Sequence, residues 1–177
     1  MNDSEKEPMI ITKPELLASL QKEVRILLHL ASKIDRSQLD YRPTPKQRST
    51  MELLQYLSYM GPSMLRYAKG EQLDRDAWEQ IVKTVASRGF DETLAAIETH
   101  GDTYATLLAD MDDAAFRAEV TGFDGAKTSC GSFIVNHVIA QCSAYRTQLF
   151  MYLKACGREE LNTSNLWVGV DQQLAVS

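Results

Sequence analysis

The stretch from Ser129 to Gly157 constrains the fold most, because its length and pattern indicate one long helix. The helical part is expected to run from about Gly131 to Cys156, and Gly157 stands where a glycine commonly ends a helix. A helix of this length buries an apolar face only if other helices cover it. The rest of the chain is therefore expected to supply long helical partners.

A first partner helix follows the N-terminal residues. Thr12 precedes Pro14 and Glu15, a pattern that predicts an N-cap with a capping box and a proline in the first turn. Apolar residues then recur three and four positions apart as far as about Ile34, which indicates an amphipathic helix.

A second partner helix begins after a connection that contains two prolines. Ser49 and Glu52 form another capping-box pattern, and apolar residues follow at helical spacing. Gly61 and Pro62 are expected to interrupt or kink this helix, which could continue to Lys69.

The middle of the chain predicts a short helix, a third long helix and a small extended segment. The short helix is expected at Asp76–Ala86, and the long one begins at Asp91 and ends near Met111. Residues Phe116 to Phe123 have strand-like character, with a turn at Asp124-Gly125. Leu166 and Trp167 are expected to pack on the bundle, since their exposure would be costly.

Together these elements predict an all-α four-helix bundle with a short extra helix and a small extended connector before the last helix. Residues 1–11 are expected to form a flexible arm, and residues 12–177 a single domain.

Composition limits the classes of partner. The net charge of −5 disfavours nucleic-acid binding, and no apolar run approaches the ~20 residues that span a bilayer. Cys130, Cys142 and Cys156 form neither a disulfide framework nor a CxxC metal site, so free thiols in a reducing, cytoplasmic compartment are expected.

Three segments carry a resemblance to a known family: LDYRPTPKQRSTMELLQYL at 39–57, VTGFDGAKTSCGSFIVNHVIAQCSAYRTQLFMYLKACG at 120–157, and the tail sequence LNTSNLW. Together they resemble the DinB-like, or YfiT-like, damage-inducible family. The resemblance implies a four-helix bundle, commonly a homodimer. It also implies a divalent metal such as nickel or zinc, held by one histidine from the second helix and two, four residues apart, from the last. Some members are thiol-dependent transferases.

The three histidine positions of that family fall here on Tyr56, Gln141 and Tyr145. Neutral phenols and amides are weak ligands for zinc or nickel, so no metal cofactor is expected. The three side chains are expected either to fill the site by hydrogen bonding to one another or to form a polar pocket for a small ligand.

Other polar residues near these positions leave alternatives open. His29, His100 and His137 could form a relocated metal site, and His137 alone could line the pocket. Arg146, which matches the family pattern, could bind a ligand carboxylate or form a structural salt bridge. Cys142 is expected to face away from the pocket, because adjacent helical residues point about 100° apart.

The resulting hypothesis is a DinB-like protein of unknown activity, without a metal, that is non-catalytic or binds a small ligand. The alternative is a divergent metal-dependent hydrolase or thiol S-transferase with a relocated site. A third possibility is an interaction protein that works through a dimer surface.

Overall fold

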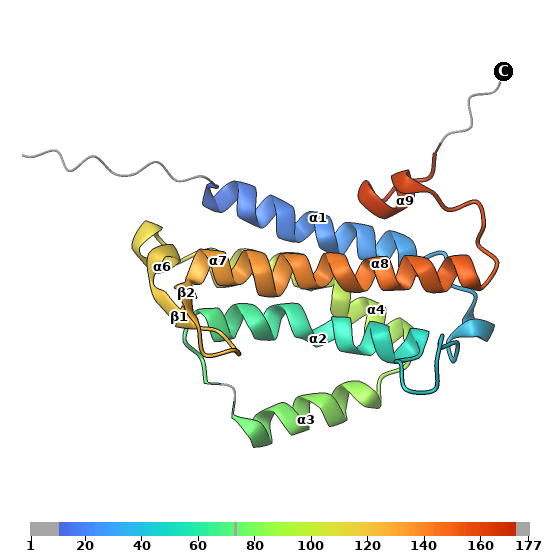
Figure 1. Cartoon of the computed structure of the whole chain (residues 1–177), viewed down its shortest axis with the longest axis horizontal. Helices are drawn as coiled ribbons and strands as arrows, with labels where there is room; N and C mark the ends of the chain where they lie inside the picture. The colour runs from blue at the N-terminus through green and yellow to red at the C-terminus, as the bar shows by residue number, and fades with distance from the viewer. Residues whose placement is uncertain (1–10, 73, 173–177) are drawn as a thin grey trace, which may run out of the picture.

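Four long helical segments pack side by side in the computed structural model, which describes residues 11–72 and 74–172 (Figure 1). The predicted arm at 1–11 lies outside these residues except for Ile11. The elements are α1 (Lys13–Ala31), the 3-10 turn η1 (Arg36–Gln38), α2 (Thr50–Ala68), α3 (Arg75–Ala86), α4 (Phe90–Glu98), α5 (His100–Leu108), α6 (Asp113–Arg117), β1 (Glu119–Thr121), β2 (Lys127–Ser129), α7 (Cys130–Ile134), the π turn η2 (Val135–Ile139), α8 (Ala140–Ala155) and α9 (Thr163–Trp167).

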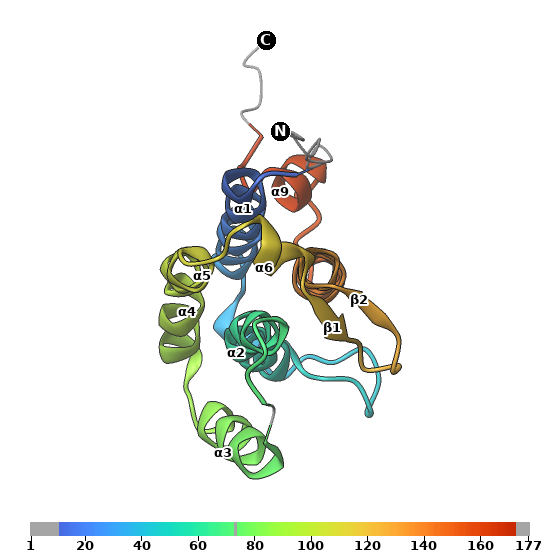
Figure 2. The ribbon, with the colours of Figure 1, turned by 90° about the vertical axis from the view of Figure 1, so that its left-hand side faces the viewer.

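The bundle consists of α1, α2, the α4–α5 pair and the continuous α7–η2–α8 segment (Figure 2). Their inward faces form one apolar core, whose fully buried members include Leu20, Ile26, Leu30, Leu53, Leu54, Leu65, Ile97, Tyr104, Phe133 and Ile134. In the described part of the chain, no helix is long and apolar enough to cross a bilayer.

The two predicted capping boxes are confirmed. Glu15 accepts a hydrogen bond from the Thr12 backbone N–H at 2.8 Å, and Thr12 caps the N–H of Glu15 in return. Glu52 accepts from the Ser49 N–H at 2.7 Å, and the Ser49 hydroxyl caps the N–H of Glu52 at 3.2 Å. These local contacts satisfy N–H groups that a helix cannot pair internally.

The helix α2 runs through Gly61 and Pro62, so the predicted interruption does not occur. A proline has no N–H, so Pro62 leaves the carbonyl of Ser58, four residues earlier, without its helical donor. The ring of His100 on α5 supplies the missing hydrogen bond, with 2.9 Å between His100 Nε2 and the Ser58 oxygen. Gly61 is needed because a Cβ there would overlap the Tyr104 hydroxyl.

The third long helix is broken in two, contrary to the single helix predicted. The break falls at Thr99, between α4 and α5. The Thr99 hydroxyl donates to the carbonyl of Ala96 at 2.8 Å, and the Thr103 hydroxyl donates to the carbonyl of Thr99 at 2.9 Å. Threonine hydroxyls that bond back to the preceding turn compete with the helix and bend it.

A two-stranded antiparallel hairpin precedes α7, as the strand-like character of this region predicted. Its register pairs Glu119 with Ser129 and Thr121 with Lys127, and Gly125 takes a positive φ of 79° in the turn. The strand is shorter than the predicted segment, because Phe116 belongs to α6.

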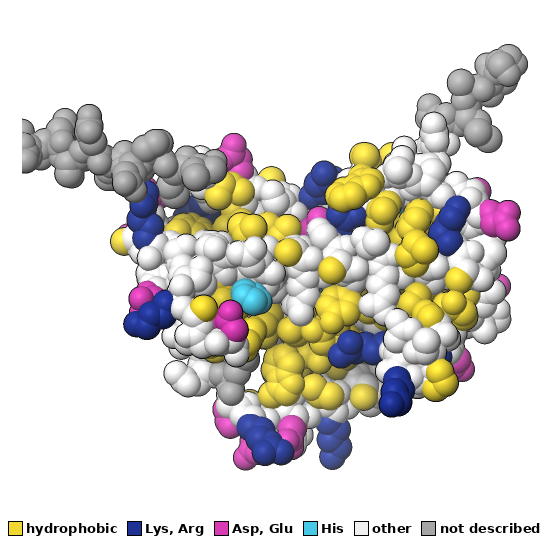
Figure 3. Space-filling view, viewed as in Figure 1, with side chains coloured by type: hydrophobic (Ala, Val, Ile, Leu, Met, Phe, Trp, Pro, Cys, Tyr) yellow, Lys and Arg dark blue, Asp and Glu magenta, His cyan; other side chains and the backbone are white. Residues whose placement is uncertain are grey.

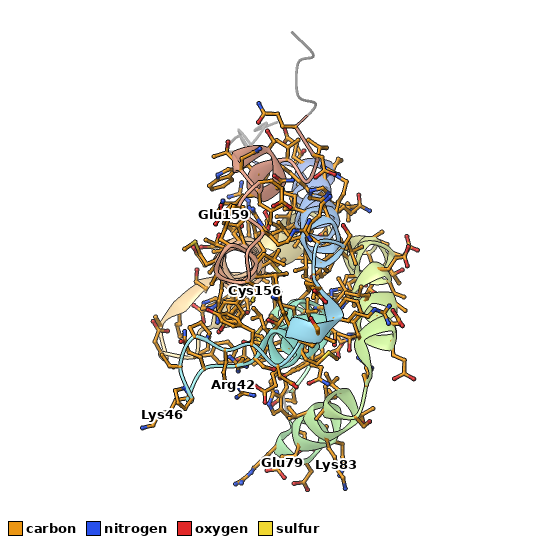
Figure 4. The ribbon with its side chains drawn as sticks, turned by 90° about the vertical axis from the view of Figure 1, so that its right-hand side faces the viewer. Arg42, Lys46, Glu79, Lys83, Cys156 and Glu159 are labelled. Atoms are coloured by element: carbon orange, nitrogen blue, oxygen red, sulfur yellow. The ribbon has the colours of Figure 1, made fainter. Side chains whose placement is uncertain are left out.

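The helix α3 lies outside the bundle and packs against α2. Figure 4 shows Glu79 and Lys83 on its outer side, and the connection that carries Arg42 and Lys46 on another side of the molecule. Because α3 covers only part of α2, cavities remain along the contact between the two helices.

Candidate functional site

The structure brings Tyr56, Gln141 and Tyr145 together, although they come from two helices. The rings of Tyr56 on α2 and Tyr145 on α8 meet edge to face, with 5.0 Å between centroids. The Gln141 amide donates a hydrogen bond of 3.1 Å to the Tyr56 hydroxyl. The three side chains therefore form one half-buried polar and aromatic cluster.

This cluster does not fit a divalent metal. A phenol binds a metal well only as the phenolate. Burial raises the pKa of Tyr56 above its ordinary value, and the neighbouring Tyr145 raises it further, although Arg48 lowers it. Ionisation of Tyr56 is thus harder than in water, and the Gln141 amide points its N–H groups rather than a lone pair at the phenol.

The three histidines lie in three separate environments. His29 on α1 contacts Asn165 at 3.1 Å and Asp171 at 3.7 Å, whereas His100 is buried against the carbonyl of Ser58. Within residues 11–72 and 74–172, no group of three His, Cys, Asp or Glu side chains could hold a metal ion. The relocated three-histidine centre is therefore not assembled by this part of the chain.

His137 belongs to a second aromatic cluster. Its ring lies 4.3 Å from that of Phe133 and 5.7 Å from that of Phe123, measured between centroids. Tyr67 on α2 stacks on Phe123 and donates a hydrogen bond to the carbonyl of Thr121. His137 lies in the π turn, which the sequence pattern did not predict, so the four residues from His137 to Gln141 do not make one regular α-helical turn.

Arg146 is fully engaged inside the protein. Its Nε donates to Glu23 Oε2 at 2.6 Å, its Nη2 donates to Glu23 Oε1 at 3.3 Å, and its Nη1 donates to the carbonyl of Leu166. The guanidinium also lies over the Trp167 ring at 5.2 Å. The structure thus places Arg146 in a buried salt bridge that connects α1, α8 and α9.

The predicted packing of the tail holds for Leu166, which contacts the core, but not for Trp167, whose side chain is 57% exposed. One face of the Trp167 ring meets the Arg146 guanidinium. This cation–π contact favours a position at the surface, where the rest of the ring faces solvent.

Cys142 faces the interior rather than the Tyr56 cluster. Burial raises the pKa of its thiol to about 12, with Glu23 adding to the effect, and the thiol interacts with the buried Tyr104 hydroxyl. A thiol that stays protonated at neutral pH is a poor nucleophile. Cys130, Cys142 and Cys156 are all free thiols, as predicted.

A cavity of about 160 Å³ opens beside Tyr56, between α2 and α3. The guanidinium of Arg48 lies over the Tyr56 ring at 4.1 Å, and the ring of Tyr59 meets both Tyr56 and Trp78 edge to face. Other side chains at its wall are Glu52, Gln55, Val82, Val85 and Ala86. Figure 3 shows hydrophobic side chains gathered between α8 and α3, over α2, with basic side chains beside them.

Sequence reasoning missed Arg48 and Tyr59 as site residues. Tyr56 and Tyr59 are three residues apart on a predicted helix, a spacing that places two aromatic side chains on one face. That spacing was the available signal. No comparable spacing in the sequence indicated that α3 would line the cavity.

Comparison with known proteins identifies the fold. No family model matches the sequence, and no curated protein matches it. The crystal structure of a DinB-like protein, YjoA, from Bacillus subtilis matches with a TM-score of 0.64 at 15% sequence identity, over 83% of this chain and 94% of that chain. The chain has the DinB-like fold.

This likeness confirms the predicted all-α DinB-like architecture and is one of fold alone. In the DinB-like bundle described here, α2 and α8 meet at Tyr56, Gln141 and Tyr145. The chemistry of the site therefore depends on these side chains and on the cavity beside them.

Proposed function

We propose that this DinB-like protein binds a small molecule without a resident metal, and that the ligand is a single-ring aromatic carboxylate held in the cavity beside Tyr56. The observation that carries this proposal is the position of Arg48. Within the described ranges, its guanidinium has Tyr56 as a stacking partner but no hydrogen bond or ion pair. Its N–H groups remain available to a ligand that enters the cavity.

The size of the cavity supports a ligand with one ring. A cavity of about 150 Å³ in another protein accommodates benzene, and the cavity beside Tyr56 measures about 160 Å³. The aromatic walls formed by Tyr56 and Tyr59 favour an aromatic ring, since edge-to-face and offset contacts add to apolar burial.

The charge of Arg48 supports a carboxylate on that ring. A guanidinium binds a carboxylate through two parallel hydrogen bonds, which are stronger than hydrogen bonds between neutral groups. Glu52 is the acidic residue at the cavity wall, but it forms no ion pair with Arg48. Its carboxylate instead accepts a hydrogen bond from the Ser49 N–H and pairs with Arg42 at 3.3 Å.

The described nucleophiles and bases support a binding role over catalysis. The Cys142 thiol is protonated and faces away from the cavity, and Arg146 is saturated by Glu23 and Leu166. A divergent metal-dependent hydrolase or thiol S-transferase with a relocated site is the alternative. It requires a metal or a nucleophile that these side chains do not supply at the cavity.

Two measurements test the proposal. Trp167→Phe protein retains Trp78, which contacts Tyr59, so benzoate binding should quench or shift its fluorescence. Arg48→Met should weaken benzoate binding about tenfold or more, since it removes a charge-assisted bond. Arg75→Met removes the same charge from an exposed site on α3 and should leave binding unchanged. No response to benzoate in the Trp167→Phe protein would overturn this assignment.

Elemental analysis of protein purified without an affinity tag tests the absence of a metal. The expected result is no stoichiometric nickel, zinc or iron, with no change in melting temperature on chelation. One equivalent of any of these metals would instead favour the hydrolase or transferase.

The proposal includes a homodimer in a reducing, cytoplasmic compartment. The free cysteines support the compartment. Exposed apolar side chains support an interface: Met151, Trp167, Val168 and Val170 are each 48–58% exposed, and Figure 3 shows hydrophobic side chains over α9. Sedimentation equilibrium should give twice the mass of one chain, and a monomer at all concentrations would remove this part of the proposal.

A further inference from the structure

A second and larger cavity of about 270 Å³ lies between α2, α3 and the α4–α5 pair. Figure 2 shows α4 and α5 on one side of α2 and the α7–η2–α8 segment, drawn in orange, on the other, with α3 beyond α2. Tyr59 lines both cavities, and so separates this one from the cavity beside Tyr56. Its polar lining residues are Ser58, Ser63, Arg66, Arg88, Thr99, His100 and Thr103.

The lining carries positive charge without a carboxylate. Arg66 from α2 and Arg88 from the loop after α3 both border the cavity, and the described lining residues include no Asp or Glu. Arg66 forms an exposed ion pair with Glu71, whose carboxylate lies 4.0 Å from the guanidinium. Such an exposed pair is weak and leaves Arg66 able to exchange partners.

Arg88 is held in place at both its backbone and its side chain. Gln55 donates to the carbonyl of Arg88 at 3.0 Å, and Arg88 Nη1 donates to the Ser58 hydroxyl at 3.3 Å. Among the described residues, Ser58 is the one side-chain hydrogen-bond partner of this guanidinium. Its other N–H groups are thus pre-positioned at the cavity without a protein acceptor.

His100 completes the wall with a fixed tautomer. The carbonyl of Ser58 can only accept a hydrogen bond, so His100 Nε2 carries the proton and Nδ1 carries the lone pair. Burial lowers the pKa of His100, and the charges of Arg88 and Arg66 lower it further. Both arginines line the same cavity as the imidazole.

We propose that this cavity binds a small oxyanion, a molecule with a phosphate or carboxylate group, between Arg66 and Arg88. Guanidinium groups match the geometry of both anions, and Ser63 also lines the cavity, where its hydroxyl could donate a further hydrogen bond. The volume of about 270 Å³ is near the lower end of small-molecule pockets, so the part of the ligand that enters it is small. This site is additional to the aromatic cavity and does not depend on a ligand there.

The test uses inorganic phosphate and acetate as separate probes, with chloride at matched ionic strength as the reference. The imidazole resonances of His100 are followed by NMR as a function of pH. An oxyanion near the ring favours the imidazolium, so the pKa of His100 should rise with the bound probe. His29, on α1, should show no such rise.

Variants connect the response to the two arginines. Arg88→Met and Arg66→Met should each weaken probe binding about tenfold, whereas Arg75→Met should not change it. Arg66 is exposed, so its variant keeps the fold even if the Arg88 variant is unstable. A response to phosphate alone assigns phosphorylated ligands, and a response to both probes adds carboxylates. No rise in the pKa of His100 with either probe, or equal weakening by Arg75→Met, overturns the proposal.

Discussion

Replacing His100 with leucine tests how α2 tolerates a proline at its centre. His100 supplies the donor at 2.9 Å to the Ser58 carbonyl, which Pro62 leaves without a helical N–H. Ser58 is only 5% exposed, so water cannot easily replace the lost donor. An unpaired buried carbonyl costs roughly 1–3 kcal/mol, and His100→Leu is expected to lower the free energy of unfolding by that amount.

The double-mutant cycle with Pro62→Ala isolates this hydrogen bond. Alanine at position 62 restores an N–H four residues after Ser58, and a carbonyl oxygen can accept two bonds. His100→Leu should therefore cost about 1–2 kcal/mol less in the Pro62→Ala protein than in the parent. Urea unfolding followed by far-UV circular dichroism measures the four proteins, at a pH well above the ordinary His pKa of 6.5.

A matched control uses His29→Leu, which removes an imidazole from α1 that does not contact Ser58. Its cost should be the same with Pro62 and with alanine, because distant sites act additively. If the costs of His100→Leu and Pro62→Ala are additive as well, the proposed rescue of the carbonyl is refuted.

Two further predictions concern charge. Arg146→Met leaves the buried carboxylate of Glu23 without its cation and should lower the free energy of unfolding in urea by about 3–5 kcal/mol. The double variant Glu23→Leu with Arg146→Met should recover much of that free energy, because no unpaired charge stays buried. An equal loss in the single and double variants would contradict this reasoning. Burial lowers the pKa of both His100 and His29, so the unfolded chain binds more protons than the native one below the ordinary value of 6.5. The free energy of unfolding should thus fall as pH drops below 6.5, with a shallower fall in His100→Leu; identical slopes would exclude His100 as a source.

Local signals predicted the helix starts because their chemistry is local. Thr12 and Ser49 each bond to a residue three positions later, so the chain itself brings the partners together. The passage of α2 through Pro62 was not predictable in this way. Its compensating donor, His100, is brought close only by the tertiary fold.

The breaks in the other helices were missed for related reasons. The apolar spacing around Thr99 suits one helix, and only the back-bonded hydroxyls show the bend. The π turn that contains His137 follows an unbroken apolar pattern, which a count in steps of three and four residues cannot distinguish from an α-helix.

The candidate site was predictable in part. Tyr56, Gln141 and Tyr145 were grouped through the resemblance to a family, because spacing alone links only the two residues on the same helix. Both cavities, and the place of Arg48 in the wall of one of them, depend on where α3 packs. The sequence of α3 indicates an amphipathic helix but does not indicate which helix its apolar face packs against.

The carbonyl that Pro62 releases has a consequence for how such chains diverge. Because the imidazole of His100 donates the hydrogen bond that the carbonyl of Ser58 would otherwise lack, positions 62 and 100 cannot change independently of each other. Among homologues that keep a proline here, the position of His100 should retain a side-chain donor. Where the proline has been lost, that position should drift toward apolar residues, so the two columns of an alignment should covary.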